Sequence, residues 1–543
     1  MALMLAYKKF QSKFRLGVWH SQALSLLIIF FFWATFISWR LLYLGFYHDD
    51  WVLLTLQYRI GEPMIIGGIY RPLNVLLNYL GVTLFGEDVQ YWHGYGAILV
   101  LLCSLVIYWC VFRLNSLIGK NNSIASLSAV FASVFWMLLP CGFGYTAWPA
   151  MFPGMIAIIF FTLAIISITY QGARYQVIAG FLFFITGLTY EVFWLAFVSL
   201  WLIKLSSRVQ IGWKNAIGTL VSYALIQLLL VFWNRGVNLF FNGQNKVVAK
   251  SINFDFLGIL SYVPYRVLAT LGVDAKNIYW LYGILISVVT IILWSAYRRS
   301  RFSLILLACI LGAFTSLFIY SLAGYAVMPT GIFSRTFIAI NLWFAIGFGV
   351  SFAFLYEKFS QRLRAAFLLC CVFIIGYLGY QTIKTTFYWA ESWEFQTQLV
   401  KKIPFQDIEK LPNSKVGVIL LLPDRRGKME SINAFWDATA MFYLKAPNLR
   451  EKIESGDLFV MVSRQGEWLS EWDGKSVSQS WCSSPAQLIG SHHLNSLYAV
   501  AMDSKTLISL PKGWSYGCGS NSDTRAWQYN KTAPLQREGT KEQ

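Results

Sequence analysis

Long apolar runs alternate with short polar stretches over the first 387 residues of this 543-residue chain. A helix that crosses a bilayer needs roughly 20 apolar residues, and about eleven runs approach that length. The pattern therefore predicts a mainly α-helical, polytopic membrane domain over residues 1–387. The predicted membrane helices cover approximately residues 22–45, 91–112, 124–140, 153–170, 175–189, 191–204, 216–234, 277–297, 302–322, 335–356 and 365–387.

Tyr190 and Glu191 interrupt the apolar run from about residue 176 to residue 203. A single helix of about 28 residues is long for a bilayer, and it would invert the topology of everything that follows. Two helices instead keep the later basic loops on one side of the membrane. We therefore predict two helices that meet at Tyr190 and Glu191. The basic loops in question cover residues 204–214, 298–301 and 358–364.

The composition supports a membrane protein. Hydrophobic residues make up 57% of the chain, aromatic residues 17% and charged residues only 13%, which is far too apolar for an ordinary soluble protein. The formal net charge of +18 is not gathered on one domain, as a nucleic-acid-binding surface would require. Many of the cations lie in short stretches between apolar runs, so we interpret the charge as membrane topology and expect no nucleic-acid partner.

The cations also predict the orientation of the chain. Lys8, Lys9, Lys13 and Arg15 precede the first span, and every second loop afterwards is basic, so the N-terminus should be cytoplasmic. The first span is long and lacks a small-residue cleavage site after it, unlike a signal peptide. The alternation assigns the remaining segments to the extracytoplasmic side: the first loop, residues 140–152, 235–276 and 323–335, and the C-terminal region.

The C-terminal region differs in character from about residue 388 onward. Prolines, frequent charges and short β-prone runs such as Val416–Leu422 predict a soluble α/β or α+β domain over residues 388–543. Its polar tail from about residue 521 is predicted to be poorly ordered. The first outer loop, residues 46–90, contains apolar sequence broken by glycine and proline, which predicts short helices along the membrane interface.

Two of the eight cysteines, Cys482 and Cys518, lie in the predicted C-terminal domain. In an oxidising compartment they are expected to form one disulfide, and the alternative is two free thiols. The other six lie in or beside apolar runs, where cysteine is an ordinary small hydrophobic residue. The chain contains no CxxC or HExxH pattern, so we predict no metal ligand.

Asp49 and Asp50 form an acidic pair at the outer end of the first span. Adjacent side chains diverge on a helix or a strand, so the two carboxylates are not expected to share a proton. One of them can act as a general base toward a hydroxyl group while the other supports it. An acid at this position is also a good helix N-cap before Trp51, and the residues alone leave both interpretations open.

Other polar side chains occur where a membrane protein usually excludes them. Arg71 lies in the first outer loop and is suited to bidentate binding of phosphate or carboxylate. His93 lies at the mouth of the second span, where a hydrogen-bonded interface residue is the plainer interpretation. Glu191 lies deep in apolar sequence and either functions or satisfies backbone donors at a turn. Arg335, on the outer side, calls for an anionic partner, either an internal acid or a lipid-linked phosphate.

Taken together, these motifs resemble the GT-C superfamily of polytopic glycosyltransferases, such as protein mannosyltransferases, aminoarabinose transferases and bacterial enzymes that modify surface polysaccharides. The resemblance covers roughly residues 20–340. It rests on the order and sidedness of five motifs: the Asp49-Asp50 pair, Arg71-Pro72-Leu73, Trp92-His93, Tyr190-Glu191 and Ser334-Arg335. Tyr190-Glu191 stands where Lys-Glu is frequent, and Ser-Arg-Thr stands where Ser-Arg-Tyr is frequent.

The resemblance implies inverting transfer of a sugar from a polyprenyl-phosphate donor to an extracytoplasmic glycan, lipid or protein. Asp49 would be the catalytic base, with Asp50 supporting or sharing that role. Arg335 would stabilise the leaving phosphate, with Arg266 and Arg71 as alternatives. His93, Tyr190 and Glu191 would complete the substrate site. The implied setting is a bacterial cytoplasmic membrane, with membrane lipids as partners and neither cofactor nor divalent metal required.

Three other functions remain open from the sequence. A transporter or flippase for lipid-linked sugars usually places charge near the bilayer midplane and shows paired repeats, whereas these charges cluster at one face and no repeat is visible. A non-catalytic assembly scaffold leaves the acidic pair unexplained. A membrane enzyme that ligates or polymerises whole glycans would share the donor lipid and the compartment.

Overall fold

A computed structural model describes residues 18–55, 58, 71–207, 213–242, 300–322, 332–422, 435–464, 468–482, 484–501 and 506–517. The chain is mostly helical and divides into two compact units. The first unit comprises residues 1–42, 63–80 and 90–385, and the second comprises residues 43–62, 81–89 and 386–543. Two pieces of the first outer loop thus belong to the same unit as the C-terminal region.

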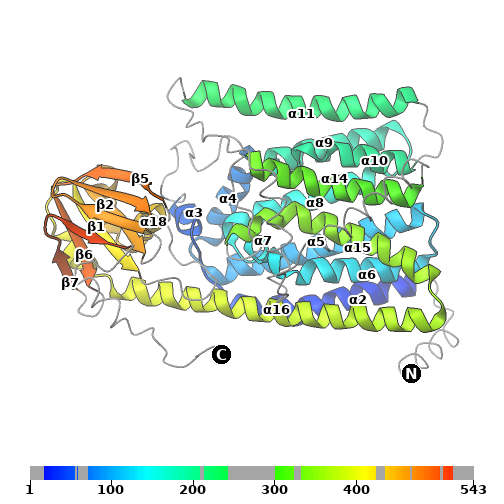
Figure 1. The fold of residues 1–543 in the computed structure, drawn as a ribbon, viewed down its shortest axis with the longest axis horizontal. Coiled ribbons are helices and arrows are strands. Elements are labelled where there is room, and N and C mark those ends of the chain that lie inside the picture. The colour runs from blue at the N-terminus through cyan, green and yellow to red at the C-terminus, as the bar shows by residue number, and fades with distance from the viewer. Residues whose placement is uncertain are drawn as a thin grey trace. The chain divides into compact units, whose positions relative to one another are not determined.

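The first unit is a bundle of long apolar helices, which lie side by side in Figure 1. Its helices are α2 (Val18–Phe36), α5 (Val89–Leu117), α6 (Asn122–Leu138), α8 (Phe152–Ile168), α9 (Ala173–Thr189), α10 (Phe197–Ser207), α11 (Trp213–Asn242), α14 (Arg301–Leu322), α15 (Ile338–Lys358) and most of α16 (Gln361–Lys402). Helical segments occupy ten of the predicted membrane spans. The remaining one, residues 277–297, lies outside the described residues.

Six helices in the described part of the chain are long and apolar enough to cross a membrane. A seventh span results if α6 and the bent segment that follows it, residues 140–146, are counted as one. These helices identify a membrane protein. Helices α9 and α10 have only 17 and 11 residues, so their lengths alone do not indicate complete spans.

The structure confirms two helices on either side of Tyr190. Helix α9 ends at Thr189, and a 3₁₀ helix, η4 (Glu191–Ala196), leads into α10. The buried Lys204 ammonium near the end of α10 donates to the carbonyl oxygens of Ile168 and Tyr170, both at 3.1 Å, close to the start of α9. The chain therefore reverses direction at Tyr190, because a continuous helix would carry Lys204 away from residue 170.

The end of the bundle that holds Lys204 also holds several of the predicted cytoplasmic cations. Arg301 donates to the Leu117 carbonyl oxygen at 2.7 Å, and Arg364 donates to that of Tyr356 at 2.7 Å. These carbonyl groups end helices α5 and α15, where cations are favoured because the last carbonyls lack helical partners. The cations at this end have a structural role.

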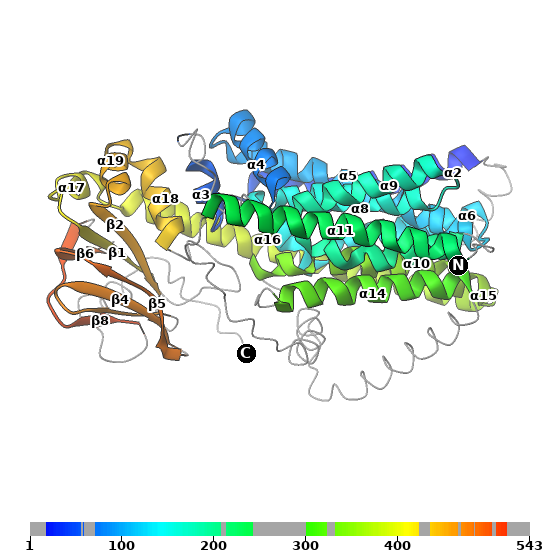
Figure 2. The same ribbon diagram turned by 90° about the horizontal axis from the view of Figure 1, so that it is seen from above.

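The second unit contains two four-stranded sheets, seen from above in Figure 2. In the first sheet, order β2-β1-β6-β7, strand β1 (Val416–Leu422) pairs in parallel with β2 (Leu458–Arg464) and β6 (Ser496–Ala501), and β7 (Thr506–Ser509) is antiparallel to β6. The second sheet, order β5-β4-β3-β8, is antiparallel between its paired strands. Its strands are β3 (Trp468–Trp472), β4 (Ser476–Trp481), β5 (Ser484–His493) and β8 (Trp514–Tyr516).

Short helices accompany these sheets. They are α3 (Asp50–Thr55), α17 (Phe405–Glu409), α18 (Phe435–Lys445) and α19 (Arg450–Glu454). Helix α4 (Pro72–Phe85) runs from the first unit into the second. Helix α18 packs against both β2 and α3, so the strand-containing region holds the residues around Asp50. Trp468 and Trp472 are buried, which makes them core aromatics, and the predicted disordered tail lies outside the described residues.

Candidate functional site

Asp49 lies in a cluster with two side chains of the second unit, His48 and Asp437. The Oδ1 atom of Asp49 is 2.9 Å from His48 Nδ1, and the Oδ1 atom of Asp437 is 3.0 Å from the same nitrogen. Asp437 comes from α18, and Asp49 immediately precedes α3. The Asp437 side chain is fully buried and that of His48 nearly so, whereas the Asp49 side chain is 33% exposed. Asp49 is thus the member of the cluster that an external group can reach.

His48 is held as a cation by these two carboxylates. Burial opposes a charge on the imidazole, but Asp437 and Asp49 outweigh it and raise the pKa of His48 to about 10. At neutral pH the Nδ1–H group therefore donates between two carboxylate oxygens. The backbone of His48 has φ of +44°, a conformation that few residues other than glycine adopt, and such strain persists only when surrounding contacts hold it.

Asp50 differs from its neighbour in burial and in bonding. It is completely buried, and its Oδ2 atom accepts a hydrogen bond from the Tyr47 backbone at 2.8 Å. Gln396 of α16 fixes both sides of this segment, since it accepts from Trp51 Nε1 at 3.0 Å and donates to the Phe46 carbonyl oxygen at 3.1 Å. Asp50 therefore supports the local backbone, which accounts for one acid of the pair in structural terms.

The same cluster has the residue types of a metal site. One ligand atom each from His48, Asp49 and Asp437 lie within 4.8 Å of one another. A metal bound at Nδ1 would displace the proton that this nitrogen carries at neutral pH, because the two carboxylates raise the pKa of His48. The described side chains form a carboxylate–imidazolium–carboxylate cluster whose three residue types could also bind a metal ion.

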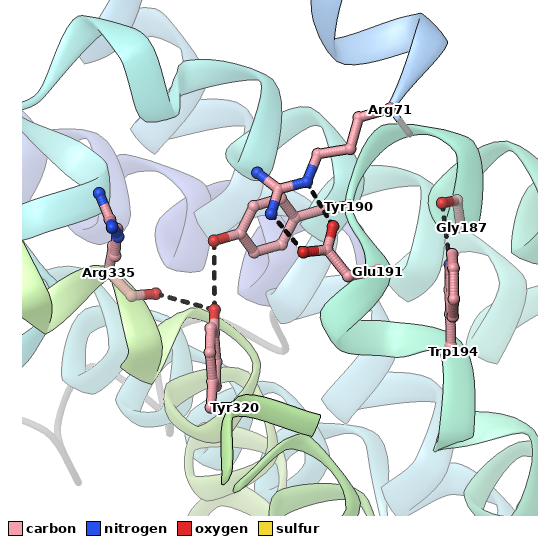
Figure 3. Close-up of polar contacts among 7 residues, drawn as sticks. All are labelled: Arg71, Gly187, Tyr190, Glu191, Trp194, Tyr320 and Arg335. Carbon is pink, nitrogen blue, oxygen red and sulfur yellow. Dashed lines mark hydrogen bonds and ion pairs between the residues drawn. The ribbon is translucent and has the colours of Figure 1, made fainter. Parts of the chain in front are cut away.

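A second polar cluster lies in the first unit, around Tyr190 at the end of α9 opposite Lys204. Figure 3 shows its side chains. Pro72 begins α4, as proline commonly does, and this places Arg71 directly before the helix. The Arg71 guanidinium donates through two nitrogens to the Glu191 carboxylate and lies 4.6 Å from the centre of the Tyr190 ring. Arg71 and Glu191 thus form a bidentate ion pair, 120 residues apart in sequence.

Arg335 is linked to this cluster through two tyrosines. The Tyr320 hydroxyl lies 3.2 Å from the Tyr190 hydroxyl and 3.4 Å from the Arg335 carbonyl oxygen. The guanidinium of Arg335 lies 5.1 Å from the Trp148 ring, and the charges of both Arg71 and Arg335 act on the Tyr190 hydroxyl. Two arginines and one glutamate give this group a formal charge of 2 − 1 = +1. The net positive charge makes this group of residues suited to binding an anion.

The remaining predicted residues lie elsewhere or outside the described part. His93 is buried in α5, with its ring 6.5 Å from that of Phe152. Cys482 is disulfide-bonded, but Cys518 and Arg266 lie outside the described residues, so the predicted pairing stays a prediction. A cavity of about 840 Å³ between α9 and α11 is lined by residues such as Gln176 and Tyr223, and no described site residue lines it.

Sequence reasoning missed Asp437 and Tyr320. Asp437 lies 389 residues from His48, in a region with many acids, and nothing local distinguishes it. Tyr320 lies in an apolar helix, where a tyrosine is unremarkable. Comparison of the chain with protein-family models and with curated proteins gives no match. Any assignment of function therefore depends on the geometry of these two clusters and on the sequence motifs.

Proposed function

We propose that this protein is an inverting membrane glycosyltransferase that moves a sugar from a polyprenyl-phosphate donor to an extracytoplasmic acceptor. The observation that carries the proposal is the pairing of a partly exposed Asp49 with the His48 imidazolium. Asp50 is buried and engaged with the backbone, so the base is assigned to Asp49. The positive charge of His48 stabilises the ionised carboxylate, which is the form that accepts a proton.

The reaction is a single displacement. As the acceptor oxygen bonds to the anomeric carbon, its proton passes to Asp49. The bond between that carbon and the phosphate oxygen breaks, and its electron pair leaves with the lipid phosphate. The phosphate changes from a singly charged diester to a monoester with a second negative charge. Asp49 then returns its proton to water. No nucleotide, cofactor or divalent metal takes part in this scheme.

Arg335 is proposed to stabilise the additional charge on the phosphate. A guanidinium aimed at developing charge lowers the barrier more than it strengthens ground-state binding. The ion pair between Arg71 and Glu191 supports a positioning role for both, since the two charges largely satisfy each other. The Tyr190 hydroxyl, which both arginines influence, is suited to a sugar or phosphate oxygen.

The proposal includes a topology. About eleven spans cross the cytoplasmic membrane of a bacterium, with the N-terminus cytoplasmic. The C-terminal region then forms an extracytoplasmic soluble domain on the side where polyprenyl-phosphate sugars are used. The confinement of carbonyl-bound cations such as Arg301 to one end of the bundle supports this orientation.

The test compares three acids of the second unit in purified full-length protein with a polyprenyl-phosphate sugar. Asp49→Asn should lower transfer by roughly 10²- to 10⁴-fold with little change in melting temperature. Asp50→Asn should lower the melting temperature, because Asp50 is buried. Asp407→Asn, at a surface position, is the matched control. Full transfer by Asp49→Asn would exclude the general base.

A further inference from the structure

Arg40 is a buried cation at the end of the first candidate span. Only 4% of its surface is exposed, and it lies in the 3₁₀ helix η1 (Ser38–Leu42) that follows α2. Its Nη1 atom is 3.4 Å from Thr146 Oγ1, which is long for a hydrogen bond, and its guanidinium lies 4.4 Å from the centre of the Phe143 ring. Its enclosed Nε atom has no hydrogen-bond partner among the described residues.

No carboxylate compensates this charge in the described part of the chain. The two contacts of Arg40 among the described residues are a neutral hydroxyl and an aromatic face. A buried guanidinium needs an anion or several hydrogen bonds to offset the loss of hydration, and a ring face offsets only part of it. Arginines in such positions are usually functional.

A second arginine contacts the same short segment. Arg40 contacts Phe143 and Thr146, and Arg335 lies over Trp148, two residues further along. Two residues of extended chain span at most about 7 Å. The Gly144 backbone also donates to Ser334 Oγ at 2.8 Å, which ties this segment to the residue before Arg335. Two cations therefore flank one fixed piece of backbone.

We infer that Arg40 is an anion-binding residue that receives a phosphate group at this end of the helical unit. The guanidinium offers the planar pair of donors that phosphate oxygens accept, and its Nε has no hydrogen-bond partner among the described residues. The phosphate belongs either to a polyprenyl-phosphate or to the headgroup of an anionic phospholipid. Only the first of these sources depends on the proposed function.

The test exploits the energetic cost of the unpaired charge. Replacing a buried ion by an apolar side chain of similar length removes that cost. Without added phosphate, Arg40→Met should therefore melt at a higher temperature than the wild type. The matched control is Arg301→Met at the opposite end of the bundle, which loses a hydrogen bond to the Leu117 carbonyl oxygen and should melt at a lower temperature.

Ligand binding is measured on the same detergent-purified full-length variants with farnesyl phosphate and farnesol. Farnesyl phosphate should raise the melting temperature of the wild type and of Arg301→Met, and farnesol should not. Arg40→Met should lose this rise and bind farnesyl phosphate about 10- to 100-fold more weakly. No sugar is transferred in this assay, so its outcome is independent of catalysis.

The same melting-temperature measurement with dioleoyl phosphatidylglycerol and with phosphatidylcholine distinguishes a polyprenyl-phosphate from an anionic phospholipid headgroup as the source of the phosphate. The site is assigned to a membrane lipid if phosphatidylglycerol raises the melting temperature, farnesyl phosphate does not, and the rise is lost in Arg40→Met. The inference is overturned if Arg40→Met melts below the wild type and responds to both phosphates as the wild type does. Arg40 would then be a structural cation.

Discussion

The two compact units of this chain carry opposite charge in their polar clusters. In the second unit, Asp49 and Asp437 flank His48, which gives a formal charge of 1 − 2 = −1 when His48 is protonated. In the first unit, the cluster of Arg71, Arg335 and Glu191 has a formal charge of 2 − 1 = +1. One cluster is suited to accepting a proton, and the other to binding an anion.

Cations that stabilise helix ends and cations that could bind an anion differ in their contacts. At the end of the bundle that holds Lys204, basic side chains donate to the last carbonyls of helices, where they stabilise the fold. At the opposite end the arginines Arg40, Arg71 and Arg335 lie against aromatic rings. A ring face orients a guanidinium without neutralising it, whereas the charge of Arg71 is also balanced by Glu191.

Among the substitutions that test this difference between the two kinds of cation, Arg335→Gln is expected to change the transfer rate most. Arg335→Gln should lower the transfer rate by about 10²- to 10³-fold at saturating donor, because the leaving phosphate loses its cation. Arg301→Gln removes a cation of the other type and should transfer sugar at the wild-type rate. Steady-state kinetics on both variants checks this. Equal rates for Arg335→Gln and the wild type would contradict the assignment of the phosphate to Arg335.

The next largest effect is expected for Asp437→Asn, in the dependence of the melting temperature on pH. The pKa of His48 is about 10 in the folded chain against 6.5 ordinarily, so its stabilisation is complete below about pH 6.5 and lost as pH rises through 10. Asp437→Asn should flatten that fall in melting temperature and reduce transfer about tenfold. Asp407→Asn is the control. Parallel curves of melting temperature against pH for the wild type, Asp437→Asn and Asp407→Asn would contradict the coupling between Asp437 and His48.

A smaller effect is expected at the ion pair of Arg71 and Glu191. Their side chains are 26% and 28% exposed, so solvent screens the pair in part. A double-mutant cycle with Arg71→Met and Glu191→Gln should give a coupling free energy of about 1 kcal/mol in unfolding. Additive effects of the two substitutions would show that the pair contributes nothing to stability.

The smallest expected effect is that of chelation. The proposed reaction uses no divalent metal, so EDTA should leave the transfer rate unchanged. Loss of transfer with EDTA and its recovery with Mn²⁺ would reassign His48, Asp49 and Asp437 to a metal site. Transfer is measured before and after dialysis against the chelator, with the melting temperature as the check on folding.

Local patterns predicted the features that depend on local sequence. The break at Tyr190 follows from a polar interruption in an apolar run, and the strand Val416–Leu422 follows from its β-prone residues. The contacts of Asp437 with His48 and of Arg71 with Glu191 depend on tertiary packing across long separations. Arg40 could have been found, because it lies at the end of the first predicted span that the cation pattern assigns to the outer side, where arginine is unusual.

The most direct test of the account is the fate of the donor phosphate. Purified protein in proteoliposomes is given a polyprenyl-phosphate sugar and an acceptor, and the phosphorus and anomeric-proton NMR signals are followed. The wild-type protein should release one free polyprenyl phosphate for each sugar transferred, with inversion at the anomeric carbon. In Asp49→Asn, neither the phosphorus signal nor the anomeric-proton signal should change. Intact donor that crosses the bilayer without release of polyprenyl phosphate would contradict the account and identify a transporter.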